Sequence, residues 1–262
     1  MSRTREQHRR RQTLAHPPRS PADRRPVALW IYGIHPVLAA LANPRRKIRR
    51  LVATKNALAR LTDAGAKIPA IAEEAAPRIL DHLLGRDAVH QGVAVEVAPL
   101  PPLALESLAD ARLIVVLDQV TDPHNVGAIL RSAAAFAADA VVTTGRHAAA
   151  ETATLAKAAS GALDLIGWIE VQNLARALEE IGAMGFIRIG LDSEADTGIE
   201  EAMSGDRIAL VLGAEGKGLR RLTRETCDVV ARLSPPGAIA SLNVSNAAAL
   251  ALYLADRHIR AR

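Results

Sequence analysis

Cysteine is almost absent from this chain, which has a single thiol, Cys227, among 262 residues. One cysteine excludes an internal disulfide and any metal site built from several thiolates. The histidines show none of the spacings that metal ligands require, so we expect no metal site. A chain without disulfides is typical of a reducing compartment, and a cytoplasmic location is therefore expected.

Aromatic residues are also scarce, at 2% of the chain, so alanine, valine, leucine and isoleucine must build the core. The bases of single-stranded RNA therefore have few rings on which to stack. No apolar run reaches the roughly 18 to 20 residues of a membrane-spanning helix, and no membrane partner is expected. The arginine-rich N-terminus lacks the apolar segment of a secretory signal, and its prolines disrupt the amphipathic helix of a transit peptide.

Positive charge is concentrated at the N-terminus. Eight arginines and two acidic residues give residues 1–26 a net charge of +6, and because the whole chain has +5, residues 27–262 carry −1. A disordered basic tail of this composition binds polyanions by releasing their counterions, and RNA is the polyanion expected in a cytoplasm. The alternative is a solvated extension without a function.

Residues 27–98 are predicted to form a small α/β unit, and an apolar content of 49% is sufficient for a second domain. Alternation over 91–97 is typical of a strand. The other predicted elements are strands at 51–53 and near 67–70 and helices at 36–42, 55–64 and 73–84. A second basic cluster occupies 45–50, and the prolines after Leu100 make 99–111 a predicted linker.

From residue 112 to the C-terminus, strands alternate with helices, which predicts an α/β domain with a parallel sheet. The run 113–117 is apolar throughout, as a strand buried on both faces requires. Further strands are expected at 139–144, 165–170, 186–191, 207–212 and 228–233, and helices at 125–137, 151–158, 173–184 and 244–260. Ligands bind at the carboxyl ends of strands in such sheets, and three loops there carry unusual polar residues.

The first of these loops leads from a strand into a helix through Asp122-Pro123-His124-Asn125-Val126-Gly127. Asn125 can cap this helix, and Arg131 in its second turn can reach back to hold a phosphate through two hydrogen bonds. An ion pair between Arg131 and Asp122 is the alternative. His124 can act as an acid–base group, although a histidine beside a proline more often packs or caps.

The second loop contains three glycines around one acidic residue, in Gly213-Ala214-Glu215-Gly216-Lys217-Gly218. Such a loop indicates a backbone that approaches a ligand closely, with Glu215 at its tip. Its spacing is neither that of a phosphate-binding P-loop nor that of a dinucleotide fingerprint. A basic rim follows at once, formed by Lys217, Arg220, Arg221 and Arg224. This pairing suits a nucleic-acid substrate better than a small anion.

The third loop joins the last strand to an alanine-rich helix. It begins with a prolyl turn after Leu233 and continues through the short polar residues Ser241, Asn243, Ser245 and Asn246. One such side chain is enough to cap a helix, so this surplus indicates a ligand site rather than a cap alone. Thr144 and Gly145, at the end of another predicted strand, can line the same cleft, whereas 160–162 indicates tight packing.

Together the three loops resemble the SpoU/TrmH branch of the SPOUT RNA methyltransferases. The matching residues are Asp122 to Gly127 with Arg131-Ser132-Ala133, Gly213-Ala214-Glu215-Gly216 with Gly218-Leu219, and Ser241-Leu242-Asn243-Val244-Ser245. The resemblance covers about 112–260, and 160–162 is similar to the internal Ser-Gly-Ala element of the family. Residues 30–98 resemble the L30e-like substrate-binding domain that many members carry.

The resemblance implies a C-terminal trefoil-knotted SPOUT domain over 112–262, preceded by the L30e-like domain over 27–98. Such a knot is an exception to the usual rule against knots. The family forms homodimers and binds S-adenosylmethionine in the knot. By matched position, the cofactor-binding residues are Gly213, Leu233, Leu242, Thr144 and Gly145, and the catalytic residues are Arg131, Asn125, Glu215 and Asn243.

The activity implied is transfer of a methyl group from S-adenosylmethionine to the ribose 2′-hydroxyl of a guanosine in 23S rRNA, on the RNA itself or a ribosomal assembly intermediate. The same chemistry on tRNA and a non-catalytic RNA-binding assembly factor are the alternatives. Arg131 would act either as a base or as a phosphate clamp. Two departures, Leu233-Ser234-Pro235 for Ile-Pro-Met and Ala137 for a glycine, fall where mainly backbone contacts are expected.

Overall fold

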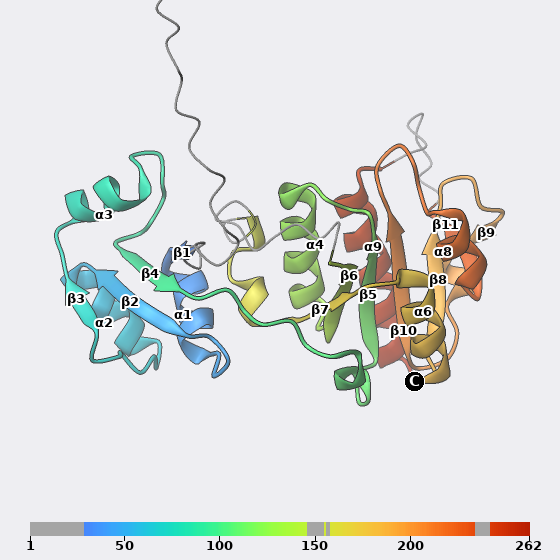
Figure 1. Ribbon diagram of the computed structural model, residues 1–262, viewed down its shortest axis with the longest axis horizontal. Helices are drawn as coiled ribbons and strands as arrows, with labels where there is room; N and C mark the ends of the chain where they lie inside the picture. The colour runs from blue at the N-terminus through green and yellow to red at the C-terminus, as the bar shows by residue number, and fades with distance from the viewer. Residues whose placement is uncertain (1–28, 146–154, 156–157, 234–241) are drawn as a thin grey trace, which may run out of the picture.

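The computed structural model describes residues 29–145, 155, 158–233 and 242–262, which form two sheets flanked by helices (Figure 1). The predicted basic tail, 1–26, lies outside the described residues. So do most of the helix expected at 151–158 and the segment 234–241, which would close the predicted knot. The knot therefore stays a prediction. No helix among the described residues is long and apolar enough to cross a membrane.

The N-terminal unit, residues 29–97, has a four-stranded sheet in the order β1-β4-β2-β3, whose central strand β4 is antiparallel to both neighbours. The strands are β1 (Leu29–Tyr32), β2 (Ile48–Ala53), β3 (Ala72–Glu74) and β4 (Val93–Val97), and the helices are α1 (Ile34–Ala42), α2 (Lys55–Asp63) and α3 (Pro77–Leu84). Val52 and Ala94 pack against Leu80 of α3, so the strands are buried on this face as well as on the face toward α1 and α2.

Two expectations for this unit are wrong. The strand expected near 67–70 is β3 instead, which pairs in parallel with β2 and places Glu73 beside Arg50. The helix expected at 73–84 begins only at Pro77, because proline fits the first helical position and the residues before it belong to the strand. Strand β2 also begins at Ile48, so part of the basic cluster 45–50 lies within the sheet.

The C-terminal unit, residues 113–260, has the predicted parallel sheet, with seven strands in the order β7-β6-β5-β10-β8-β11-β9. These are β5 (Leu113–Asp118), β6 (Ala140–Thr144), β7 (Gly167–Val171), β8 (Ile187–Leu191), β9 (Thr197–Gly198), β10 (Ile208–Gly213) and β11 (Val229–Arg232). The short β9, which the sequence did not indicate, forms one edge. Leu103, ahead of the sheet, forms a parallel bridge with Ile169 of β7.

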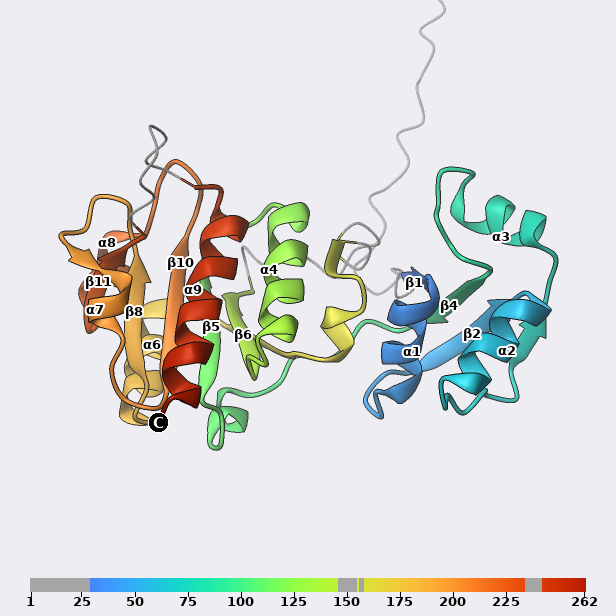
Figure 2. The same cartoon turned by 180° about the vertical axis from the view of Figure 1, so that it is seen from behind.

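Helices cover both faces of this sheet, as Figures 1 and 2 show. One face carries α4 (Pro123–Ala135) and α9 (Val244–Arg260), and the other carries α6 (Leu174–Ala183) and α8 (Arg221–Thr226). Shorter helices among the described residues include η2 (Leu105–Leu108), η3 (Ala162–Asp164) and α7 (Ile199–Ala202). Along β5, Leu113 and Val115 face α4 and α9, whereas Ile114 and Val116 face α6, which explains the continuous apolar run.

Candidate active site

The carboxyl ends of β8, β10 and β11 border a cavity of about 590 Å³. Its walls include five predicted site residues: Gly213, Glu215, Leu233, Leu242 and Asn243. These residues come from the second and third loops. The two loops lie about thirty residues apart in the sequence, and the fold brings them together. The volume lies within the roughly 300–1,000 Å³ typical of small-ligand sites, at the sheet edge where such sites form.

A hydrogen-bond network centred on Glu215 joins all three loops. Its Oε1 accepts hydrogen bonds from the side-chain amide of Asn125 at 3.1 Å and from that of Asn243 at 2.5 Å. The amide of Asn243 also donates to Oδ1 of Asn125 at 3.1 Å, and the backbone N–H of Val244 points to the same carboxylate at 3.4 Å. Three of the four predicted catalytic residues are thus in direct contact.

Asn125 is free to take part because it does not cap its helix, contrary to expectation. The cap of α4 is Asp122, whose carboxylate accepts the backbone N–H of His124 at 3.0 Å, and Pro123 occupies the first turn. Aspartate followed by proline is a favourable start for a helix, and it moves the boundary two residues upstream. Asn125 therefore lies within the first turn, with its side chain directed to Glu215. His124 is exposed.

Asn243 serves both as a helix cap and as a site residue. Its Oδ1 accepts hydrogen bonds from the backbone N–H of Ser245 at 2.9 Å and from the hydroxyl of Ser245 at 2.6 Å. Its amide nitrogen is directed to Glu215 and Asn125 instead. This partly explains the surplus of polar residues in the third loop, because the oxygen of the Asn243 amide caps the helix while its nitrogen binds the site residues. Ser241 lies outside the described residues.

The second loop is held in a tight turn. A Cβ added to Gly213 would lie 2.2 Å from the backbone carbon of Gly218, so no other residue fits without a shift of the backbone. Asp118, which is completely buried at the end of β5, also holds the end of this loop. Its carboxylate accepts the backbone N–H of Arg220 at 2.9 Å and the Nε of the same arginine at 2.6 Å.

The basic rim expected after this loop is mostly engaged in ion pairs. Arg220 pairs with Asp118, and the other two pairs are Arg221 with Glu225 and Arg224 with Asp192. Lys217 lines the cavity and makes no ion pair with any of the described residues. Most of this local charge is therefore neutralised within the chain, which leaves less of it for RNA than the sequence indicated.

Arg131, the fourth predicted catalytic residue, does not join the network around Glu215. It lies on α4 six residues after Asn125, which corresponds to about 9 Å along the axis and a different side of the helix. The side chain is exposed and makes no ion pair with the described part of the chain. The alternative pairing with Asp122 is not formed, because Asp122 caps the helix. Its guanidinium is open to an anion from outside.

Thr144, the last residue of β6, and Gly145 after it lie apart from the cavity, because β5 separates β6 from β10. The hydroxyl of Thr144 is nonetheless buried without a hydrogen-bond partner among the described residues. A buried unpaired hydroxyl costs free energy unless a partner is supplied. A cofactor role for these two residues stays a prediction.

The cavity fits S-adenosylmethionine, the cofactor that the resemblance implies. Leu212, Leu233 and Leu242 offer an apolar wall to an adenine, and the backbone of 213–218 offers hydrogen-bonding groups. Asp192 and Glu194 also line the cavity, and the carboxylate of Glu194, which makes no ion pair with the described residues, suits a ligand with a sulfonium and an ammonium group. These two acidic residues were missed from the sequence. Their place directly after a parallel strand, β8, was the signal that could have found them.

The single cysteine takes no part in this chemistry. Burial raises the pKa of the Cys227 thiol to about 12, and its Sγ donates to the backbone carbonyl of Thr223 at 3.2 Å. A thiol with so high a pKa is not a nucleophile at neutral pH, because the reactive form is the thiolate. Among the described residues there is also no cluster of side chains that could hold a metal ion.

The two units match two family models. Residues 112–253 match the SpoU rRNA Methylase family, and residues 30–103 match the domain for RNA 2′-O ribose methyltransferase substrate binding. A curated relative from Xylella fastidiosa, named 23S rRNA (guanosine-2′-O-)-methyltransferase RlmB, is 40% identical over 243 residues, with 87% of this chain and 96% of the relative covered. A relative of the same name from Pseudomonas putida is 37% identical, with 87% and 95% covered.

The fold is also that of known SpoU enzymes. The crystal structure of the SpoU methyltransferase AviRb from Streptomyces viridochromogenes, in complex with AdoMet, has a TM-score of 0.71 at 23% identity and covers 88% of this chain and 89% of its own. The AdoMet-bound rRNA methyltransferase from Sinorhizobium meliloti has a TM-score of 0.72 at 20% identity, with 88% of each chain covered. With the family model over more than half of its length and relatives at up to 40% identity, this chain belongs to the SpoU rRNA methylase family of RNA methyltransferases.

Proposed function

We propose that this protein transfers a methyl group from S-adenosylmethionine to the ribose 2′-hydroxyl of a guanosine in 23S rRNA. The observation that carries the proposal is the Asn125–Glu215–Asn243 network at the rim of the cavity. It places hydrogen-bonding groups from three loops beside the space that fits the cofactor. The relatives from Xylella fastidiosa and Pseudomonas putida, both named as 23S rRNA guanosine methyltransferases, support the choice of RNA and nucleotide.

S-adenosylmethionine, when bound, supplies an electrophilic methyl group on a sulfonium. The chain must then align the 2′-oxygen with that methyl group and help the hydroxyl to lose its proton. We assign the alignment to Glu215 and to the remaining side-chain N–H of Asn125, both of which Asn243 holds in place. The second oxygen of the Glu215 carboxylate accepts no hydrogen bond from the described residues, so it can accept one from the ribose. Gly213, Leu233 and Leu242 hold the cofactor.

We assign Arg131 to the RNA phosphate rather than to proton removal. A guanidinium stays protonated at any physiological pH, so it is a poor base. Its five donors in a planar fork match phosphate oxygens, and the exposed position on α4 suits a group that arrives from solvent. The same positive charge stabilises the alkoxide that develops on the ribose.

The N-terminal unit is the expected RNA-binding domain, which its match to a substrate-binding family model supports. The basic tail adds a second, electrostatic contact with the RNA that does not depend on the nucleotide sequence. Methylation of tRNA remains the runner-up. A non-catalytic assembly factor is disfavoured, because such a factor has no need of the intact network around Glu215.

We further propose that the enzyme is a knotted homodimer. Three large apolar side chains are exposed on α9 and just before it: Leu242 at 37%, Leu250 at 47% and Tyr253 at 44%. Tyr253 packs on Phe136 at the end of α4, with ring centroids 5.9 Å apart, so the patch extends over both helices. Exposed apolar side chains that gather in this way are typical of a protein interface. Sedimentation analysis of wild type and of Leu250→Asp tests it, and a monomeric wild type would refute the dimer.

The proposed activity is tested by transfer of a tritiated methyl group from S-adenosylmethionine to purified RNA. Ribosomal RNA from cells that lack the gene, rRNA from wild-type cells and bulk tRNA are offered separately. We expect incorporation into the unmodified rRNA alone. Incorporation into tRNA alone would favour the runner-up, and no incorporation into any RNA by folded, cofactor-binding protein would refute the enzymatic proposal.

A further inference from the structure

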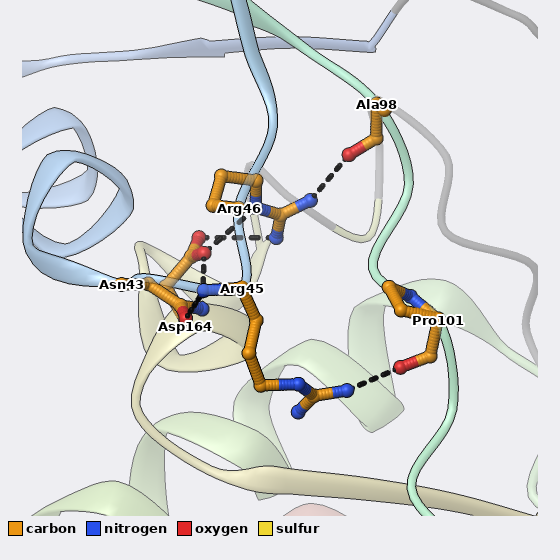
Figure 3. Close-up of polar contacts among 6 residues, drawn as sticks. All are labelled: Asn43, Arg45, Arg46, Ala98, Pro101 and Asp164. Carbon is orange, nitrogen blue, oxygen red and sulfur yellow. Dashed lines mark hydrogen bonds and ion pairs between the residues drawn. The ribbon is translucent and has the colours of Figure 1, made fainter.

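The two units are joined by an ion pair that is completely buried. Arg46, just before β2, places its guanidinium against the carboxylate of Asp164 in η3, and neither side chain has any exposed surface (Figure 3). The contact is bidentate, with Nε donating to Oδ1 at 2.7 Å and the second nitrogen donating to Oδ2 at 3.1 Å. The pairing crosses 118 residues of sequence.

Other polar contacts at the same place fix the geometry further. The amide of Asn43 donates to Oδ1 of Asp164 at 3.0 Å, and Arg46 also donates to the backbone carbonyl of Ala98 at 3.0 Å. Arg45 donates to the backbone carbonyl of Pro101, in the segment that connects the units (Figure 3). Together, these hydrogen bonds and the ion pair hold the end of α1, the residue after β4 and the connecting segment at one point.

The short helix η3 also connects this point to the candidate active site. It packs against α1 on one side and against α4, which carries Asn125 and Arg131, on the other. Glycine residues allow both contacts to be close. A Cβ on Gly161, just before η3, would lie 2.9 Å from the Cα of Pro36 in α1. A Cβ on Gly127 in α4 would lie 2.3 Å from the Cβ of Ala158, which precedes η3. The stretch 158–164 is thus packed tightly between the N-terminal unit and α4.

Stability alone is a weak reason for such a pair. Removing two charges from water costs free energy that their attraction must offset, and apolar residues of similar volume at such sites often give a protein that is equally stable or more so. An apolar contact, however, lacks the direction that a bidentate guanidinium–carboxylate pair imposes. The basic cluster 45–50 also loses Arg46 as an RNA contact, because that side chain is buried.

We propose that Arg46 and Asp164 are positioning residues, which hold the RNA-binding domain in one orientation relative to α4 so that bound RNA presents its ribose to the site. This inference rests on the proposed function. Catalysis requires the reacting atoms to be aligned, and a misplacement of about 1 Å can lower a rate by about a hundredfold. A domain that moved freely would bind RNA equally well but would rarely present the ribose in the correct place.

The test compares four proteins: wild type, Asp164→Asn, the apolar double variant Arg46→Met with Asp164→Leu, and the control Glu73→Gln. The control removes the ion pair between Glu73 and Arg50 in the N-terminal unit. This pair lies at the surface, since the side chain of Arg50 is 41% exposed and that of Glu73 is 50% exposed. For each protein, the domain arrangement is measured by small-angle X-ray scattering, and cofactor-binding sites are counted by calorimetry. The kcat per binding site is then measured on unmodified 23S rRNA, with the Kd for that RNA.

We expect Asp164→Asn to increase the maximum dimension in scattering and to lower kcat per cofactor-binding site by about tenfold or more, with an RNA Kd within about threefold of wild type. The double variant should recover thermal stability but not kcat, and the control should match wild type. An unchanged scattering profile in Asp164→Asn would overturn the inference, as would full kcat in the double variant. If the wild type methylates no RNA, the proposed function fails, whereas the scattering comparison still decides whether the pair fixes the domains.

Discussion

The carboxylate of Glu215 and the side-chain amide of Asn243 lie 2.5 Å apart, although 28 residues separate them, and Asn125 joins them from 90 residues before Glu215. A single acceptor oxygen thus gathers side chains from three loops. The carboxylate also has a second acceptor oxygen, whereas an amide in its place would keep the first oxygen and replace the second with an N–H donor.

The first prediction concerns this acceptor. Glu215→Gln should lower kcat for methyl transfer about a hundredfold, since it replaces the second carboxylate oxygen, which we assign to the ribose, with an N–H donor and misaligns the 2′-hydroxyl. Cofactor affinity should change much less, because the cavity wall retains its shape. Calorimetry and single-turnover methyl transfer measure the two effects. Glu225→Gln is the matched control, because it breaks only an exposed pair with Arg221. Activity equal to wild type in Glu215→Gln would contradict a role for the second carboxylate oxygen in alignment.

The second prediction distinguishes the two roles of Arg131. If it clamps a phosphate, Arg131→Ala should lower kcat/KM about tenfold to a hundredfold, as expected for the loss of hydrogen bonds to a charged group. Arg131→Lys should then recover part of the rate, since it keeps the charge, and the pH profile should keep its shape. A base would instead give a profile that changes with the substitution. Arg176→Ala, on the opposite face of the sheet and 78% exposed, serves as the control.

A third prediction follows from the turn at Gly213. Gly213→Ala should abolish measurable cofactor binding, because its methyl group would lie 2.2 Å from the backbone of Gly218 and force the loop open. Gly198→Ala should bind the cofactor normally, since its Cβ would meet only Glu201 at 4.0 Å and its φ is −70°. Calorimetric titration of both variants with S-adenosylmethionine decides the matter, and normal binding by Gly213→Ala would mean that the loop does not hold the cofactor.

The basic tail gives a fourth prediction. Deletion of residues 1–26 removes a net charge of +6, so the slope of log Kd for RNA against log salt should become shallower. Affinity for the cofactor should stay the same. Filter binding at several salt concentrations measures the slope. If the slope does not change, the tail is an extension that plays no part in RNA binding.

The fifth prediction concerns pH and the pair of Arg188 with Asp228. The hydrogen bonds from Arg188 hold the pKa of the Asp228 carboxyl below its usual value. The pair therefore contributes stability above the ordinary aspartate pKa of about 3.9, and that contribution is lost as the pH falls through the lower folded value. Asp228→Asn should lower Tm at pH 7, and the difference from wild type should shrink as the pH falls below the ordinary aspartate pKa. A difference in Tm that does not depend on pH would contradict this assignment.

Much of the catalytic unit could be predicted from the sequence, because buried parallel strands are apolar throughout and their helices follow at regular intervals. The motif residues Glu215 and Asn243 stood out for a similar reason, since a glycine-rich turn and a surplus of caps are local signals. The start of α4 was placed wrongly because two capping residues, Asp122 and Asn125, compete locally, and only the position of Pro123 decides between them.

What the sequence could not reveal were the long-range pairs. Arg46 is one of several arginines in a basic cluster, and nothing local marks it as the buried one. Asp118 similarly ends an ordinary strand, although it holds the second loop through Arg220. Burial of a charge depends on which distant carboxylate the fold brings to it, so these residues become visible only in three dimensions.

The most direct test of the account is nucleoside analysis of 23S rRNA after incubation with the enzyme and S-adenosylmethionine. The RNA is taken from cells without the gene, digested to nucleosides and analysed by mass spectrometry for 2′-O-methylguanosine. We predict that wild type adds one such nucleoside per 23S rRNA, whereas Glu215→Gln adds very little in the same time. A base-methylated nucleoside, or no change in 2′-O-methylguanosine with folded, cofactor-binding enzyme, would contradict the account.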